Sequence, residues 1–154
     1  MFHSLTDIHI APVNGISIVS AKQDDIPLLV DIINQSYTDL SVTFEQLKGY
    51  TQTEAFCPEL WIMAIDNINS CIAGCGIADF DKALHEGIIE WIQVVPAYRG
   101  RKIGQFIVNE LLKRMESIAE FATVSGKVNN LTSPEMLYRK CGVVGNDVWH
   151  VLTK

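Results

Sequence analysis

The chain has 154 residues, of which 48% are hydrophobic and 19% charged; this is typical of one soluble globular domain and excludes a disordered chain. The formal net charge of −6 argues against general nucleic-acid binding, because a phosphate backbone is bound by clusters of basic residues. The same acidic balance favours a cationic or amine-bearing partner.

No apolar run approaches the roughly 20 residues needed to cross a bilayer. The N-terminal sequence MFHSLTDIHIAPVNG has neither the basic nor the apolar region of a secretory signal. Cys57, Cys71, Cys75 and Cys141 lack a spacing typical of zinc sites, so we expect buried, reduced thiols. These features predict a cytoplasmic protein that contacts no membrane and binds no metal.

Residues 1–14 form an N-terminal arm, in which His9–Ile10 is either a short edge strand or part of a loosely held segment. A strand is predicted at 16–19. Helices follow at about 24–37 and 43–51, because their apolar residues recur at helical spacing.

The middle of the chain predicts strands at 60–65, 71–80 and 88–95. The first two of these strands are joined by a turn at Asp66–Asn67. A long helix at 102–118 carries an apolar stripe that should face a sheet.

The C-terminal part predicts a strand at 121–128, a short helix at 133–140 and a last strand at 147–152. The strand, long helix and strand should form a right-handed crossover between parallel strands. The element order implies a layered α/β (α+β) domain over residues 15–154, built around a mixed sheet.

Residues 88–115 carry the first functional hypothesis. An apolar strand stops at Pro96, a short basic turn follows, and an amphipathic helix begins at about Lys102. A helix N-terminus has partial positive charge and unpaired N–H groups, so it is a ready site for phosphate. Arg99 and Arg101 add cationic side chains there. The sequence therefore predicts a phosphate-bearing ligand at this turn.

Two motifs resemble those of the GNAT superfamily of N-acetyltransferases. RGRKIG, residues 99–104, resembles the acyl-CoA-binding motif, and NNLTSPEMLYRKCG, residues 129–142, resembles the later motif with an asparagine and a helix ending in LY. Lys102 stands where the family has its first glycine, and Val143 stands where it usually has phenylalanine. The resemblance implies acetyl-CoA as co-substrate. It also implies a mostly antiparallel sheet, splayed after the fourth core strand and flanked by about four helices.

In the family's binding mode, backbone N–H groups of the turn and helix start hold the pyrophosphate. The arginine at position 99 orders the turn, and the strand edge before Pro96 bonds the pantetheine arm. Val94 would also offer its N–H to the thioester carbonyl. Asn130 matches the asparagine that bonds the pantetheine arm, with Asn129 as the competing choice. The residues expected to bind the coenzyme are Ile92, Val94, Arg99, Gly100, Arg101, Lys102, Ile103, Gly104 and Asn130.

Acetyl transfer to an amine requires a base, because an alkylammonium must lose a proton before it attacks. Glu90 is the candidate, since family members often carry the base on this strand. Simple strand alternation places Glu90 with Ile92 and Val94 on one face of the sheet and Trp91 on the other. The alternative is a structural hydrogen bond or a position at a solvated edge.

Tyr138, in the LY position, matches the family residue that protonates the departing thiolate; the alternative is an ordinary packing tyrosine. The first two helices normally shape the acceptor cleft, and Tyr37 and Tyr50 suggest a partly aromatic pocket. The acceptor is a small amine or, as the next option, a protein N-terminus or lysine. Family members are often dimers, so a homodimer is possible. Two other functions stay open: a non-catalytic acyl-CoA sensor, and an interaction domain without a ligand.

Overall fold

The computed structural model describes residues 1–36, 41–126 and 134–148. Within these ranges six strands form one sheet in the order β1-β6-β5-β4-β3-β2, antiparallel at every neighbouring pair except β5 and β6. The predicted mixed, mostly antiparallel sheet is therefore confirmed. The strands are β1 (Phe2–His3), β2 (Ile16–Ser20), β3 (Trp61–Asp66), β4 (Cys71–Asp81), β5 (Glu86–Val94) and β6 (Phe121–Val124), and the helices are α1 (Ile26–Ser36), α2 (Phe44–Tyr50), α3 (Ile103–Met115) and α4 (Pro134–Lys140).

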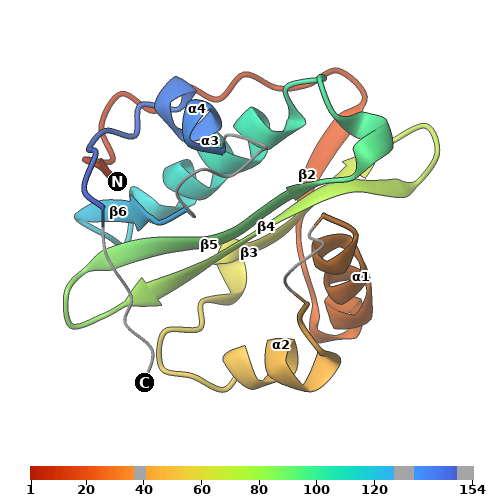
Figure 1. Ribbon diagram of the computed structural model, residues 1–154, viewed down its shortest axis with the longest axis horizontal. Coiled ribbons are helices and arrows are strands. Elements are labelled where there is room, and N and C mark those ends of the chain that lie inside the picture. The colour runs from red at the N-terminus through yellow and green to blue at the C-terminus, as the bar shows by residue number, and fades with distance from the viewer. Residues whose placement is uncertain (37–40, 127–133, 149–154) are drawn as a thin grey trace.

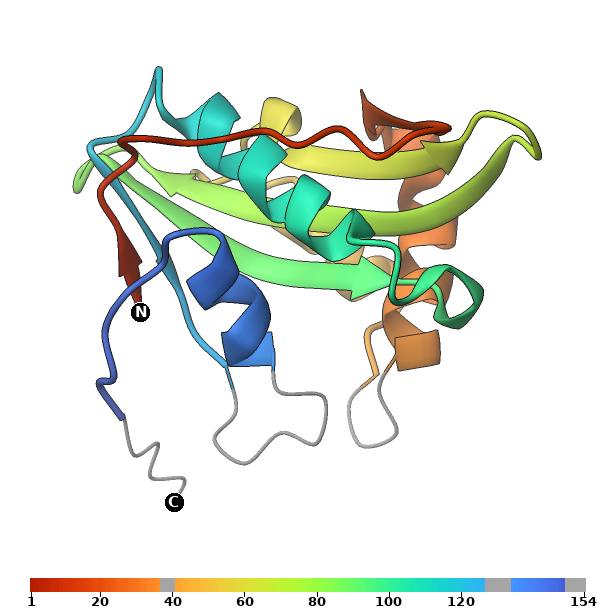
Figure 2. The ribbon, with the colours of Figure 1, turned by 90° about the horizontal axis from the view of Figure 1, so that it is seen from above.

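The helices cover the two faces of the sheet in pairs. α3 and α4 lie on one face, and α1 and α2 lie on the other (Figure 1). Each face has its own buried cluster, one centred on Ile107 and Leu111 of α3 and the other on Leu29 and Ile33 of α1. Figure 2 shows α3 lying diagonally across the strands, with the N-terminal part of the chain running beside it. Asn109 of α3 donates its side-chain amide to the His9 carbonyl at 2.9 Å, which ties that part to the helix.

β5 and β6 pair along only part of their length. The parallel register runs from Glu86 opposite Phe121 to Ile89 opposite Val124. In the described part of the chain no pairing between these strands continues past Ile89, and the two ribbons diverge in Figure 2. β5 continues to Val94 with β4 alone as its partner. The sheet is therefore splayed after its fourth core strand, as the family resemblance implied.

The N-terminal arm differs from both sequence alternatives. His9 and Ile10 are in no strand, and β1 lies instead at Phe2–His3, where it pairs with β6. Leu5 is 5% exposed and belongs to the α3-side core, so this part of the arm is packed. The predicted last strand, 147–152, falls mostly outside the described residues, and its first two residues form no strand.

The thiols are less uniformly buried than predicted. Cys75 and Cys141 are buried, whereas Cys57 is half-buried and Cys71 is exposed; all four are free. Burial raises the pKa of both the Cys75 and the Cys141 thiol to about 12. Cys141 is therefore a packed, protonated thiol and no nucleophile. In the described ranges no helix combines the length and apolar character needed to cross a membrane.

Close packing of α3 on the sheet depends on glycine at one position of β4. A Cβ atom at Gly76 would lie 2.5 Å from Cγ2 of Ile107 and 3.0 Å from Cδ1 of Leu111. Both side chains are fully buried, so neither can turn into solvent. The helix would have to move away from the strand.

We expect Gly76→Ala to lower the free energy of unfolding by about 1–3 kcal/mol through overpacking. Thermal unfolding should show a Tm several degrees lower. Gly49→Ala is the control: a Cβ there meets nothing within 4 Å, and alanine favours the α2 helix. Equal Tm values for the two variants would contradict the packing argument.

Candidate functional site

A groove of about 410 Å³ opens between the end of β5, the turn that follows it, and helices α3 and α4. α3 is 13 residues long, and the first N–H groups of a helix have no intrahelical partner. Ile103, Gly104 and Gln105 of that first turn line the groove. Arg99, Lys102 and Lys140 add positive charge to its wall, so the groove suits an anionic ligand. Of the residues predicted to bind the coenzyme, those that line it are Val94, Arg99, Gly100, Lys102, Ile103 and Gly104.

The turn at the groove uses two left-handed backbone positions. Gly100 has φ of 78° and Lys102 has φ of 62°. Glycine adopts this conformation freely, whereas an L side chain such as that of Lys102 is strained there. The structure thus explains why the family motif has glycine at the Lys102 position. In this chain the helix start keeps the same turn at a conformational cost.

Helix α4 packs close to the start of α3 at Gly104. A Cβ atom at Gly104 would stand 3.3 Å from Cδ2 of Leu137 and 3.5 Å from Cγ2 of Val94. The groove floor is therefore made where β5, α3 and α4 meet. This close approach fits the small residue that the family motif has at this place.

Arg99 folds back onto the end of β5. Its Nε donates to the Val94 carbonyl at 3.2 Å, which fits the predicted role of ordering the turn. The N–H and C=O of one residue in an antiparallel strand point to the same side. The Val95 N–H bonds to Ala73 on β4 at 2.9 Å, so the Val94 groups point away from β4. The N–H of Val94 is therefore on the groove side of β5.

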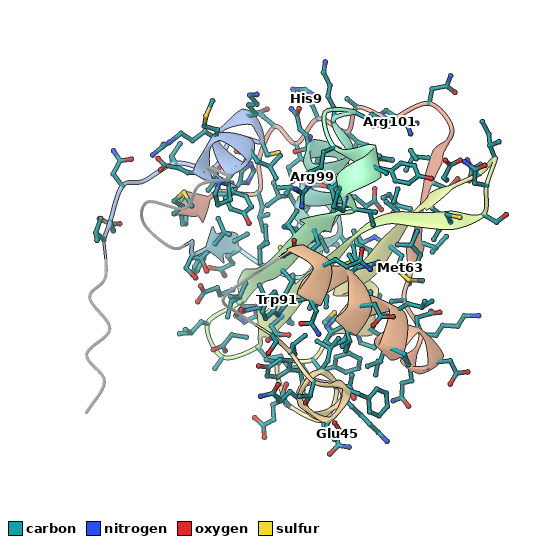
Figure 3. The ribbon with its side chains drawn as sticks, turned by 45° about the vertical axis from the view of Figure 1, so that its right-hand side comes forward. His9, Glu45, Met63, Trp91, Arg99 and Arg101 are labelled. Carbon is teal, nitrogen blue, oxygen red and sulfur yellow. The ribbon has the colours of Figure 1, made fainter. Side chains whose placement is uncertain are left out.

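Arg101 and Ile92 do not line the groove in the described structure. The Arg101 guanidinium lies over the Tyr98 ring, 5.2 Å from its centroid. Figure 3 shows Arg99 and Arg101 at the same end of α3. Ile92 packs against the α3-side core. The Arg101 side chain, expected to add positive charge at the phosphate site, lies instead over Tyr98. The role expected for its backbone N–H stays a prediction.

Glu90 occupies a β-bulge. Trp91 stands opposite Ile77 and Ile89 stands opposite Ala78, so Glu90 is the extra residue on β5. Ile89 and Ile92 consequently pack on the same, α3-covered face, although they are three residues apart.

The alternation predicted from sequence is confirmed for Trp91, Ile92 and Val94 and is wrong for Glu90. Trp91 packs with the α1-side cluster, where Figure 3 shows it beside α1, and the bulge turns Glu90 toward this side as well. Glu90 does not share the face of Ile92 and Val94. The groove at the end of β5 and the Glu90 carboxylate thus lie on opposite faces of one strand.

A second carboxylate lies beside Glu90. Asp79 follows Ile77 by two residues on β4, and Ile77 belongs to the α1-side cluster, so Asp79 faces the same way. Burial raises the pKa of Glu90, and the negative charge of Asp79 raises it further. Burial also raises the pKa of Asp79. Glu90 nevertheless has an exposed side chain, so it combines partial desolvation with access from solvent.

Tyr138 is 7% exposed and packs in the α3-side core. Its backbone carbonyl accepts from the N–H groups of Cys141 and Val143, which closes the end of α4. Tyr50 is 43% exposed at the end of α2. Tyr37, Asn129 and Asn130 lie outside the described residues. The described part of the chain holds no group of three or more His, Cys, Asp or Glu side chains suited to a metal.

The sequence did not single out Gln105, Met136, Leu137 and Lys140, which line the groove, nor three residues on which the geometry of the site depends. Tyr98 lines the groove, Asp66 bonds Tyr98, and Asp79 lies beside Glu90. The sequence pattern identified Asp66 only as a turn residue. Tyr98 lies within the basic turn but has no charge, so no pattern singled it out. The pairing of Asp79 with Glu90 depends on strand register, which no local pattern in the sequence encodes.

Comparison with solved structures finds the same fold in known acetyltransferases. A GCN5-related N-acetyltransferase from Sphaerobacter thermophilus has a TM-score of 0.78 at 23% identity over 92% of this chain. The match covers 45% of that protein, so this chain spans less than half its length. An aminoglycoside acetyltransferase from an uncultured soil metagenomic sample, solved with sisomicin, has a TM-score of 0.71 at 14% identity, with 92% and 97% of the two chains covered.

The NatC complex bound to Gag peptide and CoA gives a TM-score of 0.68 at 18% identity, with 81% of this chain and 82% of that chain covered. No curated protein sequence matches the chain. The model of the acetyltransferase (GNAT) family matches residues 27–143. That range contains the bulged strand, the cationic turn and both helices of the groove. The chain therefore belongs to the GNAT family of acetyltransferases and is an acyltransferase.

Proposed function

We propose that this protein transfers an acetyl group from acetyl-CoA to a primary amine by direct attack within a ternary complex. The observation that carries the proposal is the arrangement around β5. The cationic groove lies at the end of β5 with α3 and α4, and the Glu90 carboxylate lies on the opposite, α1-covered side of the same strand. One strand thus separates a place for the coenzyme from a place for the amine.

The coenzyme would bind in the groove, as acetyl-CoA does in the family. The N–H groups of the first α3 turn would hold the pyrophosphate, with Lys102 and Lys140 beside it. The N–H of Val94 would polarise the thioester carbonyl. Asn130 remains the candidate for the pantetheine arm. No resident metal is required by this scheme.

The reaction would proceed in one transfer step. The amine loses a proton to Glu90, directly or through a water, and its nitrogen attacks the thioester carbonyl carbon. The C–S bond then breaks, and Tyr138 donates a proton to the thiolate of CoA. The nitrogen loses its second proton as the amide forms, and this proton restores the Tyr138 phenol. A raised pKa suits Glu90 as a base, because it lies nearer to the pH at which the enzyme works.

We propose a small cationic amine as the acceptor. Glu90 and Asp79 provide two carboxylates beside each other on the acceptor face, and the chain as a whole has a net charge of −6. The similar structure solved with sisomicin adds support for a small acceptor. A peptide or protein amine is the second candidate, because the similar NatC complex was solved with a peptide. We propose Tyr37 and Tyr50 as aromatic residues of the acceptor cleft.

We further propose a cytoplasmic location and one catalytic domain over residues 15–154, with a homodimer as the oligomeric state to test. A non-catalytic acyl-CoA sensor is the competing function. It would need the groove and would have no use for Glu90 or Tyr138 as proton carriers.

The function is tested by measuring CoA thiol release from acetyl-CoA with a panel of small amines and N-terminal peptides. We expect turnover with at least one cationic amine, and a fall in kcat of about 10²-fold or more for Glu90→Gln. Tyr138→Phe should lower kcat with little change in the KM for acetyl-CoA. Binding of acetyl-CoA without CoA release by any acceptor would favour the sensor. Turnover that stays unchanged in both variants would contradict the roles proposed for Glu90 and Tyr138.

The pH profile provides a second test. Since the carboxylate is the base, kcat/KM should fall as the pH drops through the pKa of Glu90, which lies above the ordinary value of 4.5. Asp79→Asn removes a neighbouring negative charge but leaves the burial, so the acidic limb should move to lower pH and stay above 4.5. Asp81→Asn, two residues further along β4, should leave the midpoint unchanged. An identical midpoint in Asp79→Asn and the wild type would contradict the assignment.

Lys102 provides a third test. Lys102→Gly should relieve the left-handed strain and keep or raise the Tm. It should also weaken acetyl-CoA binding about three- to tenfold in titration calorimetry, because one cation leaves the groove wall. Lys113→Ala, at the opposite end of α3, is the control for charge alone. Unchanged affinity in Lys102→Gly would show that its side chain makes no contact with the coenzyme.

A further inference from the structure

The turn between β3 and β4 is bonded to the turn that borders the groove. Asp66 ends β3 and is 5% exposed. Its Oδ1 accepts from the N–H groups of Ile68 at 2.9 Å and Asn69 at 3.3 Å, and its Oδ2 accepts from Nδ2 of Asn69 at 3.0 Å. A fourth bond reaches out of this turn: the Tyr98 hydroxyl donates to Oδ2 at 2.8 Å.

Tyr98 links this buried carboxylate to the groove. It closes the short helical turn η3 (Pro96–Tyr98), and its side chain lines the groove. The guanidinium of Arg101 lies over the same ring, 5.2 Å from its centroid. Figure 1 shows the β3–β4 turn and the start of α3 at the same end of the sheet. Asp66 itself does not line the groove, so it reaches the ligand site only through Tyr98.

The backbone of the turn has few bonds of its own and one strained position. Its local bonds, from Tyr98 N–H to Val95 and from Arg99 N–H to Pro96, close single turns within the segment. Lys102 is strained at φ of 62°. The bond from Tyr98 to Asp66, 32 positions earlier in the chain, ties the segment to a separate turn of the sheet.

We propose that Asp66 and Tyr98 are positioning residues that hold the groove turn in the conformation that binds the coenzyme. The proposal rests on the proposed function of the groove. If only a fraction of the molecules has the turn in this conformation, the apparent dissociation constant rises by the inverse of that fraction. The bond between Tyr98 and Asp66 keeps the fraction near one.

Both groups stay in the required protonation states over a wide pH range. The N–H of Ile68 and the Tyr98 hydroxyl lower the pKa of Asp66 to about 2. The bond to Asp66 raises the pKa of Tyr98. The carboxylate is thus an acceptor and the phenol a donor throughout the neutral range.

The test measures acetyl-CoA binding by calorimetry, together with KM, kcat and Tm, for the wild type, Tyr98→Phe, Asp66→Asn and the double variant. Phenylalanine keeps the ring and its contact with Arg101 and removes only the hydroxyl. We expect each single variant to raise both the dissociation constant and the KM for acetyl-CoA about three- to tenfold. The value of kcat at saturation should stay within about twofold. The double variant should bind acetyl-CoA no more weakly than the single variant with the lower affinity, because both changes remove the same bond between Tyr98 and Asp66.

Asp81→Asn is the matched control. Asp81 also accepts from two backbone N–H groups of its own turn, those of Ala83 and Leu84, but it bonds no tyrosine in the described structure. Asp81→Asn should destabilise the turn between β4 and β5, while the affinity for acetyl-CoA stays unchanged.

Three results would overturn the proposal: unchanged affinity in both single variants, an effect of Tyr98→Phe without one of Asp66→Asn, or a lower Tm at constant affinity. A wild type that binds no acetyl-CoA would instead refute the function proposed for the groove.

Discussion

The second half of β5 has a strand partner on one side only, and the arrangement of the site follows from this constraint. Past Ile89 the described part of β6 provides no further pairing, while β4 remains bonded to β5 as far as Val94. Backbone donors and acceptors on the open side need other partners. The Val94 carbonyl accepts a hydrogen bond from Nε of Arg99. Val94, at the end of this open edge, lines the groove between α3 and α4, where an extended ligand arm can take the place of a strand.

In the proposed reaction, the β-bulge at Glu90 places the base and the coenzyme groove on opposite faces of the sheet. Without the extra residue, Glu90 would point to the α3-covered face with Ile92 and Val94. The bulge instead sends it toward Asp79 and the α1-covered face. The cationic groove and the paired carboxylates are therefore separated by one strand thickness. An anionic coenzyme and a cationic amine would each meet a complementary field on its own side.

Much of the fold could be predicted from the sequence because its local patterns are strong. The helical spacing of apolar residues in α1 and α3 and the apolar runs of β3, β4 and β5 led to the right elements and class. The cationic turn from Arg99 to Lys102 was found because helix start, glycine and charge coincide there. β1 was misplaced, since two residues that pair with a distant strand leave no periodic pattern. Glu90 was assigned to the wrong face because a bulge depends on cross-strand register. The link between Asp66 and Tyr98 was missed for the same reason: it joins two turns that only the folded sheet brings together.

We propose that the open edge of β5 and the first turn of α3 receive the coenzyme. Residue-resolved amide hydrogen exchange, measured by NMR with and without acetyl-CoA, tests this directly. We expect slower exchange on binding at Val94, Ile103 and Gly104, and unchanged exchange in α2. Binding that leaves these three amides unchanged, or that protects α2 in their place, would contradict it.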